Sequence, residues 1–351
     1  MSRLKYARFE SPADWRAAEI EARTDWIHRL SAPEVAEIEA ALAGVKRMGI
    51  GIAEVNRQNF PLSLFARLVE RAHDVLENDC GMFLIRGLPV EKHPVEDMRL
   101  IYWALGQYLG KAVTQSSKGD VLGDVRDMSM FNDGRGRGYQ SRRNLEFHTD
   151  SCDVVGLLVV RTAKSGGLSK IASSVAIHNE FVRSRPDLLE PLYGTFAGYS
   201  PGERAGGYWT QPVFSSQDGF FSCKTGYVYF RLAAEKFSGE VPPLTPLAIE
   251  ALEYFQVLAN RPEVHFSMMF QPGDLQLLNN HVTLHARTDF EDYAEPDRKR
   301  HLFRLWLSVP NSRPLSPLMA GVYRDVRPGV LRGGYPATPG RMVFHSDATQ
   351  D

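Results

Sequence analysis

The chain has 351 residues, of which 43% are apolar and 24% are charged, with a formal net charge of -1 at pH 7. This composition is ordinary for a globular protein, and the near-neutral balance gives no electrostatic case for binding nucleic acid or a membrane surface. A single domain over residues 1–351 is expected, because β-rich enzyme domains with added helices are often long.

The cysteines Cys80, Cys152 and Cys223 are odd in number and lack CxxC spacing, which argues against a disulfide framework or a zinc knuckle. The N-terminal residues contain no apolar core of signal-peptide length. No apolar run approaches the ~20 residues of a membrane span. We therefore expect a cytoplasmic protein.

Residues 1–79 are predicted to form a helical extension packed on the core. A first helix is expected over 12–30, where the apolar positions are Trp15, Ile20, Trp26 and Ile27. The segment Ser31-Ala32-Pro33-Glu34 is a capping box that begins a second helix. A third helix, from residue 62 to about 77, has amphipathic spacing.

Residues 81–87 form a short apolar stretch closed by glycine, which predicts a strand, and a helix is expected over 95–109. The next segment, 111–145, is rich in Gly, Asp, Arg and Ser and includes the basic stretch 134–139. Such a stretch could contact RNA, but in a neutral protein a loop is the better interpretation. Because the loop leads directly into His148, we predict that it forms a lid over the site that begins there.

An imidazole and a carboxylate stand two residues apart at His148 and Asp150, just before the apolar, β-branched run 154–161. That run predicts a buried strand. Alternate side chains of a strand share a face, so His148 and Asp150 would offer one nitrogen and one oxygen to a single metal ion. Alone the pair is weak evidence, because a surface His and Asp at a strand end is the ordinary alternative.

A second cluster, residues 272–287, adds His281 and His285 after a turn and an apolar strand. Their four-residue spacing occurs in helical zinc sites, but the residues between them lack the glutamate of HExxH and are typical of a strand. Two histidines and one carboxylate form the facial triad whose preferred metal is Fe(II) and whose usual chemistry is oxygen activation. Spacing alone leaves His281 and His285 as alternatives for the third ligand.

The last predicted strand covers residues 300–308. Its alternate side chains point to opposite faces, and one face carries Arg300, Leu302, Arg304, Trp306 and Ser308. Surface solvation is the ordinary interpretation of an arginine near a strand end. Two arginines on an apolar inner face would be costly to bury without anions. A guanidinium binds both oxygens of a carboxylate and stays charged, so this face predicts an anion-binding site.

The remaining segments complete a mainly β protein with peripheral α-helices. Residues 194–224 are irregular and rich in aromatic residues, which suits the lining of a substrate pocket. Helices are expected after residue 174 and over 245–260, and strands over 264–309. Short strands with peripheral helices around one metal site are typical of a jelly-roll sandwich. The irregular tail, 311–351, either covers the barrel mouth or contacts a second subunit, which leaves a homo-oligomer open.

Four motifs, His148-Thr149-Asp150, Gly166–Ser169, Asn279–Arg287 and Arg300–Arg304, together resemble the TauD/TfdA family of Fe(II)- and 2-oxoglutarate-dependent dioxygenases. The resemblance extends from about residue 80 to 310. It implies a double-stranded β-helix (jelly-roll) core, Fe(II), 2-oxoglutarate as co-substrate, O2 and a small-molecule substrate. Alignment on the family motif selects His285 as the third metal ligand.

The same resemblance implies further site residues. Arg300 would hold the distal carboxylate of 2-oxoglutarate, and Arg304 would be either its partner or an anchor for an acidic group of the substrate. Ser169 stands where the family usually has a threonine that bonds this carboxylate, and its hydroxyl keeps the donor. Leu168 replaces a common acidic residue. Asn144 matches a substrate-contacting position in some members, with a loop cap as the alternative.

The expected function is hydroxylation of an unactivated C–H bond in a small carboxylate-bearing molecule such as an amino acid. Asp150 occupies the carboxylate position and leaves no site for a halide, which favours hydroxylation over halogenation. Desaturation and oxidative cyclisation in a biosynthetic pathway are alternatives. Rival classes are a catalytically silent β-sandwich that binds a small acid, and a zinc hydrolase, which would need neither oxygen nor keto acid. Arg142 and Arg143 are further candidates for an anionic substrate group.

Overall fold

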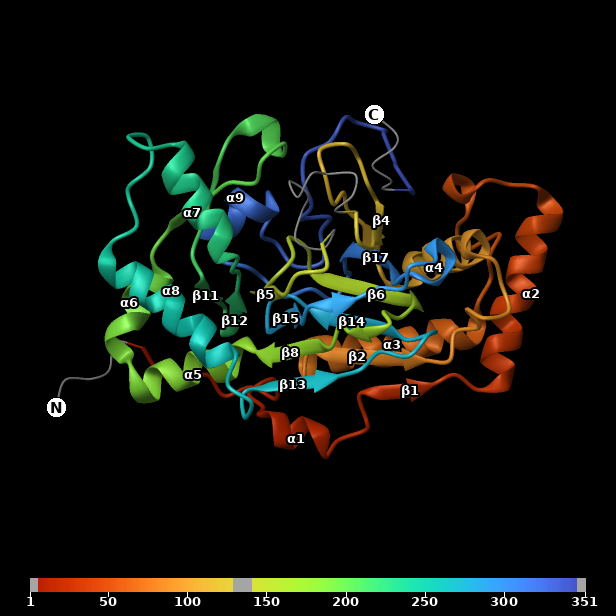
Figure 1. Ribbon diagram of the computed structural model, residues 1–351, viewed down its shortest axis with the longest axis horizontal. Coiled ribbons are helices and arrows are strands. Elements are labelled where there is room, and N and C mark those ends of the chain that lie inside the picture. The colour runs from red at the N-terminus through yellow and green to blue at the C-terminus, as the bar shows by residue number, and fades with distance from the viewer. Residues whose placement is uncertain (1–5, 129–140, 346–351) are drawn as a thin grey trace.

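The computed structural model describes residues 6–128 and 141–345, and its centre is a pair of facing β-sheets (Figure 1). The larger sheet has the strand order β1-β2-β14-β6-β17-β3, with β4 also paired to β17. Apart from the parallel pair β1–β2, neighbouring strands run antiparallel. The strands are β1 (Ile27–Arg29), β2 (Met82–Arg86), β3 (Lys111–Ala112), β4 (Leu122–Val125), β6 (Val154–Arg161), β14 (Leu275–Asn279) and β17 (His301–Ser308).

The smaller sheet is antiparallel with the order β13-β8-β15-β5. Its strands are β13 (His265–Met268), β8 (Ser169–Ser173), β15 (Thr283–Arg287) and β5 (Leu145–His148). Short two-stranded ribbons lie beside it. They pair β9 (Phe196–Gly198) with β10 (Trp209–Gln211), β11 (Phe214–Gln217) with β12 (Phe220–Cys223), and β7 (Ser165–Gly166) with β16 (Phe290–Glu291).

Helices cover the outer faces of both sheets (Figure 1). One apolar cluster joins α2 (Ala32–Met48), α3 (Ser63–Asn78) and α4 (Val95–Leu109) to the larger sheet. Another joins α5 (Ser174–Ser184), α6 (Leu189–Tyr193), α7 (Tyr227–Lys236) and α8 (Pro246–Ala259) to the smaller sheet. The short helices α1 (Ala17–Glu21) and α9 (Ala320–Tyr323) lie elsewhere on the surface of this core.

The predicted alternation of residues 300–308 is confirmed in β17. Phe303, Leu305 and Leu307 pack in the cluster with the helices, whereas Leu302 and Trp306 belong to clusters between the sheets. The inter-sheet cluster also takes Val155 from β6 of the larger sheet and Ile171 from β8 of the smaller. Even-numbered side chains of β17 therefore face the interior of the sandwich, where Arg304 also points.

The capping box predicted at Ser31 is confirmed. The Glu34 carboxylate accepts a hydrogen bond of 2.7 Å from the Ser31 backbone N–H, and Gly49 ends α2 in the left-handed conformation with φ of 66°.

The helix predicted over 12–30 is wrong for most of that range. Only Ala17–Glu21 is helical, and Ile27–Arg29 instead pairs with β2 as an edge strand. The spacing explains the error: Trp15, Ile20 and Trp26 stand five and six residues apart, which does not place them on one helical stripe. All three insert into the inter-sheet cluster.

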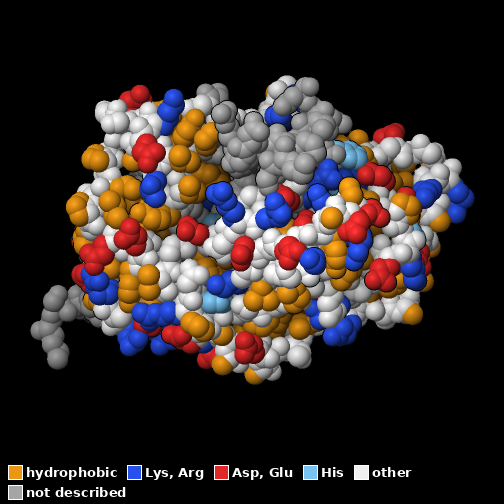
Figure 2. Space-filling model, viewed as in Figure 1, with side chains coloured by type: hydrophobic (Ala, Val, Ile, Leu, Met, Phe, Trp, Pro, Cys, Tyr) orange, Lys and Arg blue, Asp and Glu red, His pale blue; other side chains and the backbone are white. Residues whose placement is uncertain are grey.

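Four further expectations concern the cysteines, a membrane span, the surface charge and the lid. Cys80, Cys152 and Cys223 are buried free thiols, so the predicted lack of a disulfide framework is confirmed. No helix in residues 6–128 or 141–345 combines the length and apolar character needed to cross a bilayer. On the face shown in Figure 2, cationic and anionic side chains are interspersed. The basic stretch 134–139, predicted to be a lid, lies outside the described residues.

The C-terminal tail packs on the loop that precedes β6 and is fixed there by a buried ion pair. The Arg332 side chain is fully buried, and its Nε donates to Asp153 Oδ1 at 2.8 Å. Asp153 also bonds His281 Nε2 at 2.9 Å. The Gly334 N–H donates to the Ser151 carbonyl at 2.7 Å, so the tail is fixed directly to the loop that carries Asp150.

Replacing Arg332 by Met should lower the free energy of unfolding by about 3–5 kcal/mol, because it leaves a buried carboxylate without its cation. Urea denaturation followed by circular dichroism measures the change. The control is Arg327→Met, which removes a pair with Asp325 whose arginine side chain is 74% exposed, and which should change little. Equal stability of Arg332→Met and wild type would contradict the anchoring role.

Candidate metal centre and its two cavities

Two histidines face each other across neighbouring strands. His148, the last residue of β5, is the register partner of His285 in β15, and antiparallel partners present their side chains on the same face. Their ring centroids are 4.2 Å apart. His148 Nδ1 lies 2.8 Å from the Glu146 carbonyl, which can only accept, so Nδ1 carries the proton and Nε2 keeps its lone pair.

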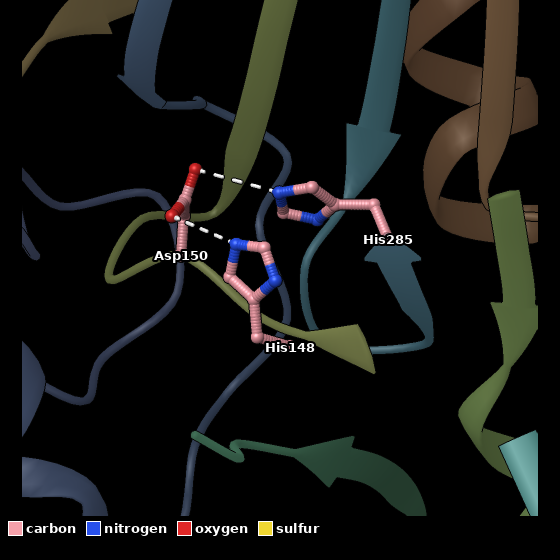
Figure 3. Close-up of side chains that lie close together, drawn as sticks. All are labelled: His148, Asp150 and His285. Atoms are coloured by element: carbon pink, nitrogen blue, oxygen red, sulfur yellow. Dashed lines mark ion pairs between the residues drawn. The ribbon is translucent and has the colours of Figure 1, made fainter. Parts of the chain in front are cut away.

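Asp150 completes the cluster from the loop after β5, with one carboxylate oxygen facing each of the two rings (Figure 3). Its oxygens lie 4.0 Å from His148 Nε2 and 3.8 Å from His285 Nε2. The prediction that His148 and Asp150 share a strand is wrong, because β5 ends at His148. Asp150 is instead positioned by its N–H, which donates to Asn280 Oδ1 at 3.0 Å, and by Trp306 Nε1, which donates to Oδ2 at 2.7 Å.

The three side chains are in the protonation states that metal binding requires, which are neutral imidazoles and an ionised carboxylate. Burial lowers the pKa of both imidazoles, that of His285 to about 3, so both are neutral at neutral pH. Burial alone would raise the pKa of Asp150, but the charge of Arg304 and the two nearby imidazoles lower it to about 2. Two neutral nitrogens and one carboxylate oxygen are therefore available together.

These three residues fit a divalent metal with open coordination positions. One ligand atom from each of His148, Asp150 and His285 lies within 4.8 Å of the others. An N,N,O donor set on one side of the ion suits Fe(II). The structure brings His285 and not His281 to this point, because His281 Nε2 is bonded to Asp153 at 2.9 Å.

An inner cavity lies between the sheets below His148 and His285, lined by Ser169, Gln276, Arg287, Arg300 and Arg304 together with apolar side chains. Arg300 is buried, and its NH1 has no hydrogen-bond partner among the described residues. Burial lowers the pKa of Arg300 to about 9, and the charge of Arg287 adds to this shift. Both amide atoms of Gln276 are likewise buried without a partner in the described part of the chain. Unsatisfied donors around a buried cation fit the carboxylate of a keto acid.

An outer cavity of about 210 Å³ opens on the other side of His148 and Asp150. Asn144 lies at its exposed rim, while Phe147, Trp209, Trp306 and Tyr335 supply aromatic surface. Of the other substrate candidates, Arg142 and Arg143 do not line this cavity. Arg142 pairs with Asp127 at 2.9 Å, and the Arg143 carbonyl accepts from Arg287.

Arg304 stands where the two cavities meet and lines both. Its NH1 lies 3.7 Å from Asp150 Oδ2, and its Nε donates to Gln115 Oε1 at 2.7 Å. Gln115 Nε2 in turn donates to the Arg304 carbonyl at 2.8 Å, so one glutamine fixes both ends of the residue. Arg300 lines only the inner cavity of the two. The two arginines thus share a strand face but occupy different surroundings.

Three polar residues of these cavities were not found from the sequence. Gln276 stands between Leu275 and Leu277, and its alternation with them was a signal that it faces inward. Arg287 ends the second histidine cluster and donates to the Ser141 carbonyl at 2.7 Å. Lys224 lies in a segment expected only to supply aromatic lining, and its burial in the outer cavity has no sequence signal.

Comparison with known proteins assigns the chain to a family. The model of the family described as taurine catabolism dioxygenase TauD, TfdA family, matches residues 49–306. The chain belongs to the TauD/TfdA family. The predicted resemblance is therefore confirmed, and the protein is an Fe(II)- and 2-oxoglutarate-dependent oxygenase that uses O2.

Two curated relatives cover most of this TauD/TfdA chain. FR-33289 synthase from Streptomyces rubellomurinus is 32% identical over 312 residues, covering 85% of this chain and 90% of the relative. The taurine hydroxylase-like protein SAT17 from Stachybotrys chartarum is 27% identical over 307 residues, covering 83% of this chain and 77% of the relative.

A solved structure confirms the predicted jelly-roll fold. Asparagine oxygenase in complex with Fe(II), 2S,3S-3-hydroxyasparagine and succinate aligns with a TM-score of 0.62 at 16% identity. The alignment covers 81% of this chain and 93% of that one. The mainly β core with peripheral helices predicted from the sequence is thus the fold of this TauD/TfdA protein.

The metal-free protein should bind one Fe(II) under anaerobic conditions, and His148→Ala and His285→Ala should each lose this binding, because each variant removes one nitrogen donor. Isothermal titration with Fe(II) measures it. The matched control is His281→Gln, which keeps a polar group toward Asp153 and should bind the metal normally. Loss of binding in His281→Gln together with normal binding in His285→Ala would contradict the choice of ligand.

Proposed function

We propose that this protein hydroxylates an unactivated C–H bond of a small molecule that carries an acidic group, with a carboxylate-bearing compound such as an amino acid as the first expectation. The observation that carries the proposal is the position of Arg304, a buried cation at the boundary of the outer cavity and 3.7 Å from Asp150. A cation there can hold an anionic substrate with a C–H bond directed at the metal position.

In this proposal His148, Asp150 and His285 hold Fe(II), and the inner cavity holds 2-oxoglutarate. Arg300 binds the distal carboxylate of the keto acid, with hydrogen bonds from Ser169 and Gln276. When bound, Fe(II) and 2-oxoglutarate supply the reduction of O2 that releases succinate and carbon dioxide and oxidises the substrate. The protein contributes orientation and a site from which water is excluded.

The chain's own residues keep this arrangement fixed. Trp306 bonds the carboxylate of Asp150 and Asn280 bonds its backbone N–H, so two protein groups orient this ligand. Asp150 would occupy the coordination position that a halide ligand needs in a halogenating enzyme. Its presence therefore supports hydroxylation over halogenation. The Arg304 guanidinium donates to the Gln115 amide oxygen, and this hydrogen bond orients Arg304 for substrate binding.

The relatives support a small, charged substrate. Asparagine oxygenase is described with a hydroxylated amino acid and succinate, and SAT17 is named for its likeness to an enzyme of taurine, an aminosulfonate. Both kinds of compound carry an acidic group on a short carbon chain. The outer cavity combines such an anion site with the aromatic side chains Phe147, Trp209 and Trp306.

Small acids should stimulate the conversion of 2-oxoglutarate to succinate by the iron-loaded protein. We expect amino acids and aryl or alkyl carboxylates, screened beside sulfonates and phosphonates, to include a compound that gives succinate and a product enlarged by one oxygen atom. Mass spectrometry and NMR identify that product. Stimulation only by neutral or cationic compounds would contradict the anionic anchor, and no succinate with any compound would contradict the activity.

The two arginines should have separable effects. Arg300→Gln should weaken 2-oxoglutarate binding by about 2–5 kcal/mol, as expected when a buried charge pair loses one partner. Arg304→Gln should leave keto-acid binding nearly unchanged and instead raise the concentration of acid needed for stimulation. Calorimetry of the anaerobic metal-loaded protein measures the first effect, and succinate formation the second.

The matched control is Arg298→Gln, whose arginine is exposed near the start of the same strand and should behave as wild type. Equal losses of keto-acid affinity in Arg300→Gln and Arg304→Gln would show instead that the two arginines form one clamp on 2-oxoglutarate.

A further inference from the structure

Lys224 is a buried lysine in the wall of the outer cavity. It follows β12, and its backbone N–H donates to the Val213 carbonyl at 2.8 Å. The residue is only 5% exposed, and it lines the outer cavity. The ammonium Nζ donates to the Thr149 carbonyl at 2.8 Å and approaches Thr149 Oγ1 at 3.3 Å. Lys224 is thus held against the residue that precedes Asp150.

This ammonium forms no ion pair with any carboxylate of the described residues. Within the described ranges, no carboxylate lies within 4.0 Å of Lys224 Nζ, and both of its oxygen contacts belong to the uncharged Thr149. The Asp150 carboxylate already accepts from Trp306 and lies beside Arg304 and the two imidazoles. Burying an ammonium without a counter-ion costs free energy, and an anion that enters the cavity would recover it.

The charges of the two cavities indicate where such an anion belongs. In the inner cavity, Arg300 is a buried cation whose missing partner is supplied by the keto acid. In the outer cavity Lys224 is a second buried cation, whose contacts are with the uncharged Thr149, and Arg304 lines the same cavity beside Asp150. Asp150 lies beside Arg304, and in the loaded enzyme it would also be a ligand of the metal. The outer cavity therefore holds two positive side chains for whatever acid the substrate carries.

We infer that Lys224 is a specificity residue which, together with Arg304, binds the oxyanion of the substrate. This inference rests on the proposed function and deepens it, because it assigns the acidic group to a site with two cations rather than one. A carboxylate, a sulfonate and a phosphonate share the chemistry that such a site recognises. Two cations discriminate against the neutral amide of the same skeleton, which can offer neither of them a negative oxygen.

The test uses four probes with one aminoethyl skeleton: 3-aminopropanoate, 2-aminoethanesulfonate, 2-aminoethylphosphonate and the neutral 3-aminopropanamide. Each is titrated calorimetrically into the anaerobic protein loaded with Fe(II) and 2-oxoglutarate. Wild type should bind at least one acid about tenfold or more tightly than the amide. Lys224→Met should bind that acid roughly ten- to hundredfold more weakly, because a charge-assisted hydrogen bond is lost.

Two further variants and a second measurement separate recognition from folding. Lys224→Gln keeps a polar group that can still donate to Thr149 but removes the charge, and it should lose acid binding as Lys224→Met does. Lys236→Met, in an exposed lysine of α7, should behave as wild type. In every variant the visible charge-transfer band of the iron–keto acid complex should remain, and the affinity for the amide should not change.

Three outcomes overturn the inference. The inference is contradicted if both Lys224 variants keep the acid affinity of wild type, or if wild type binds none of the three acids. It is also contradicted if Lys224→Gln loses the charge-transfer band, because Lys224 would then only hold the Thr149 loop. Failure of the proposed function is separate: wild type would bind acids in a Lys224-dependent way yet form no succinate with any compound.

Discussion

The antiparallel pairing of β5 with β15 sets His148 directly opposite His285, and the rest of the site depends on this register. If β5 slipped by one residue against β15, His148 would turn toward the helices that cover the smaller sheet and away from His285, because side chains alternate between faces. Asp150 reaches the same point from a loop and needs Asn280 and Trp306 to hold it. Packing between the sheets thereby fixes three metal-ligating atoms before any metal arrives, and burial keeps the histidines neutral.

Unpaired buried cations divide the interior into two binding regions. Arg300 lies in the inner cavity with the unsatisfied amide of Gln276, and Lys224 lies in the outer cavity without a carboxylate partner in the described part of the chain. Arg304 stands between them beside Asp150. A buried cation without a counter-ion costs free energy, which an acid bound next to Arg300 or Lys224 would offset. This arrangement supports the proposal that the enzyme binds two acids, one on each side of the metal position.

The sequence predicted the positions of those residues that lie in a local pattern or a family motif. The alternation of β17 predicted that Arg304 and Trp306 face inward, and the family motif selected His285 over His281. Patterns failed where the position depends on distant packing. Asp150 lies in a loop beyond the end of β5. The segment 12–30 is mostly not helical, and Trp15 and Trp26 pack in the inter-sheet cluster instead. Lys224 has no local signal at all, since only the folded chain brings it to Thr149.

We propose that one metal position separates a keto-acid cavity from a substrate cavity. Diffraction from crystals grown anaerobically with Fe(II) and 2-oxoglutarate, recorded at the iron absorption edge, would locate both groups. We expect one anomalous peak within bonding distance of His148 Nε2, His285 Nε2 and an Asp150 oxygen, with the distal carboxylate of the keto acid on Arg300. A peak at another position, or a keto acid in the outer cavity with its carboxylate on Lys224, would contradict it.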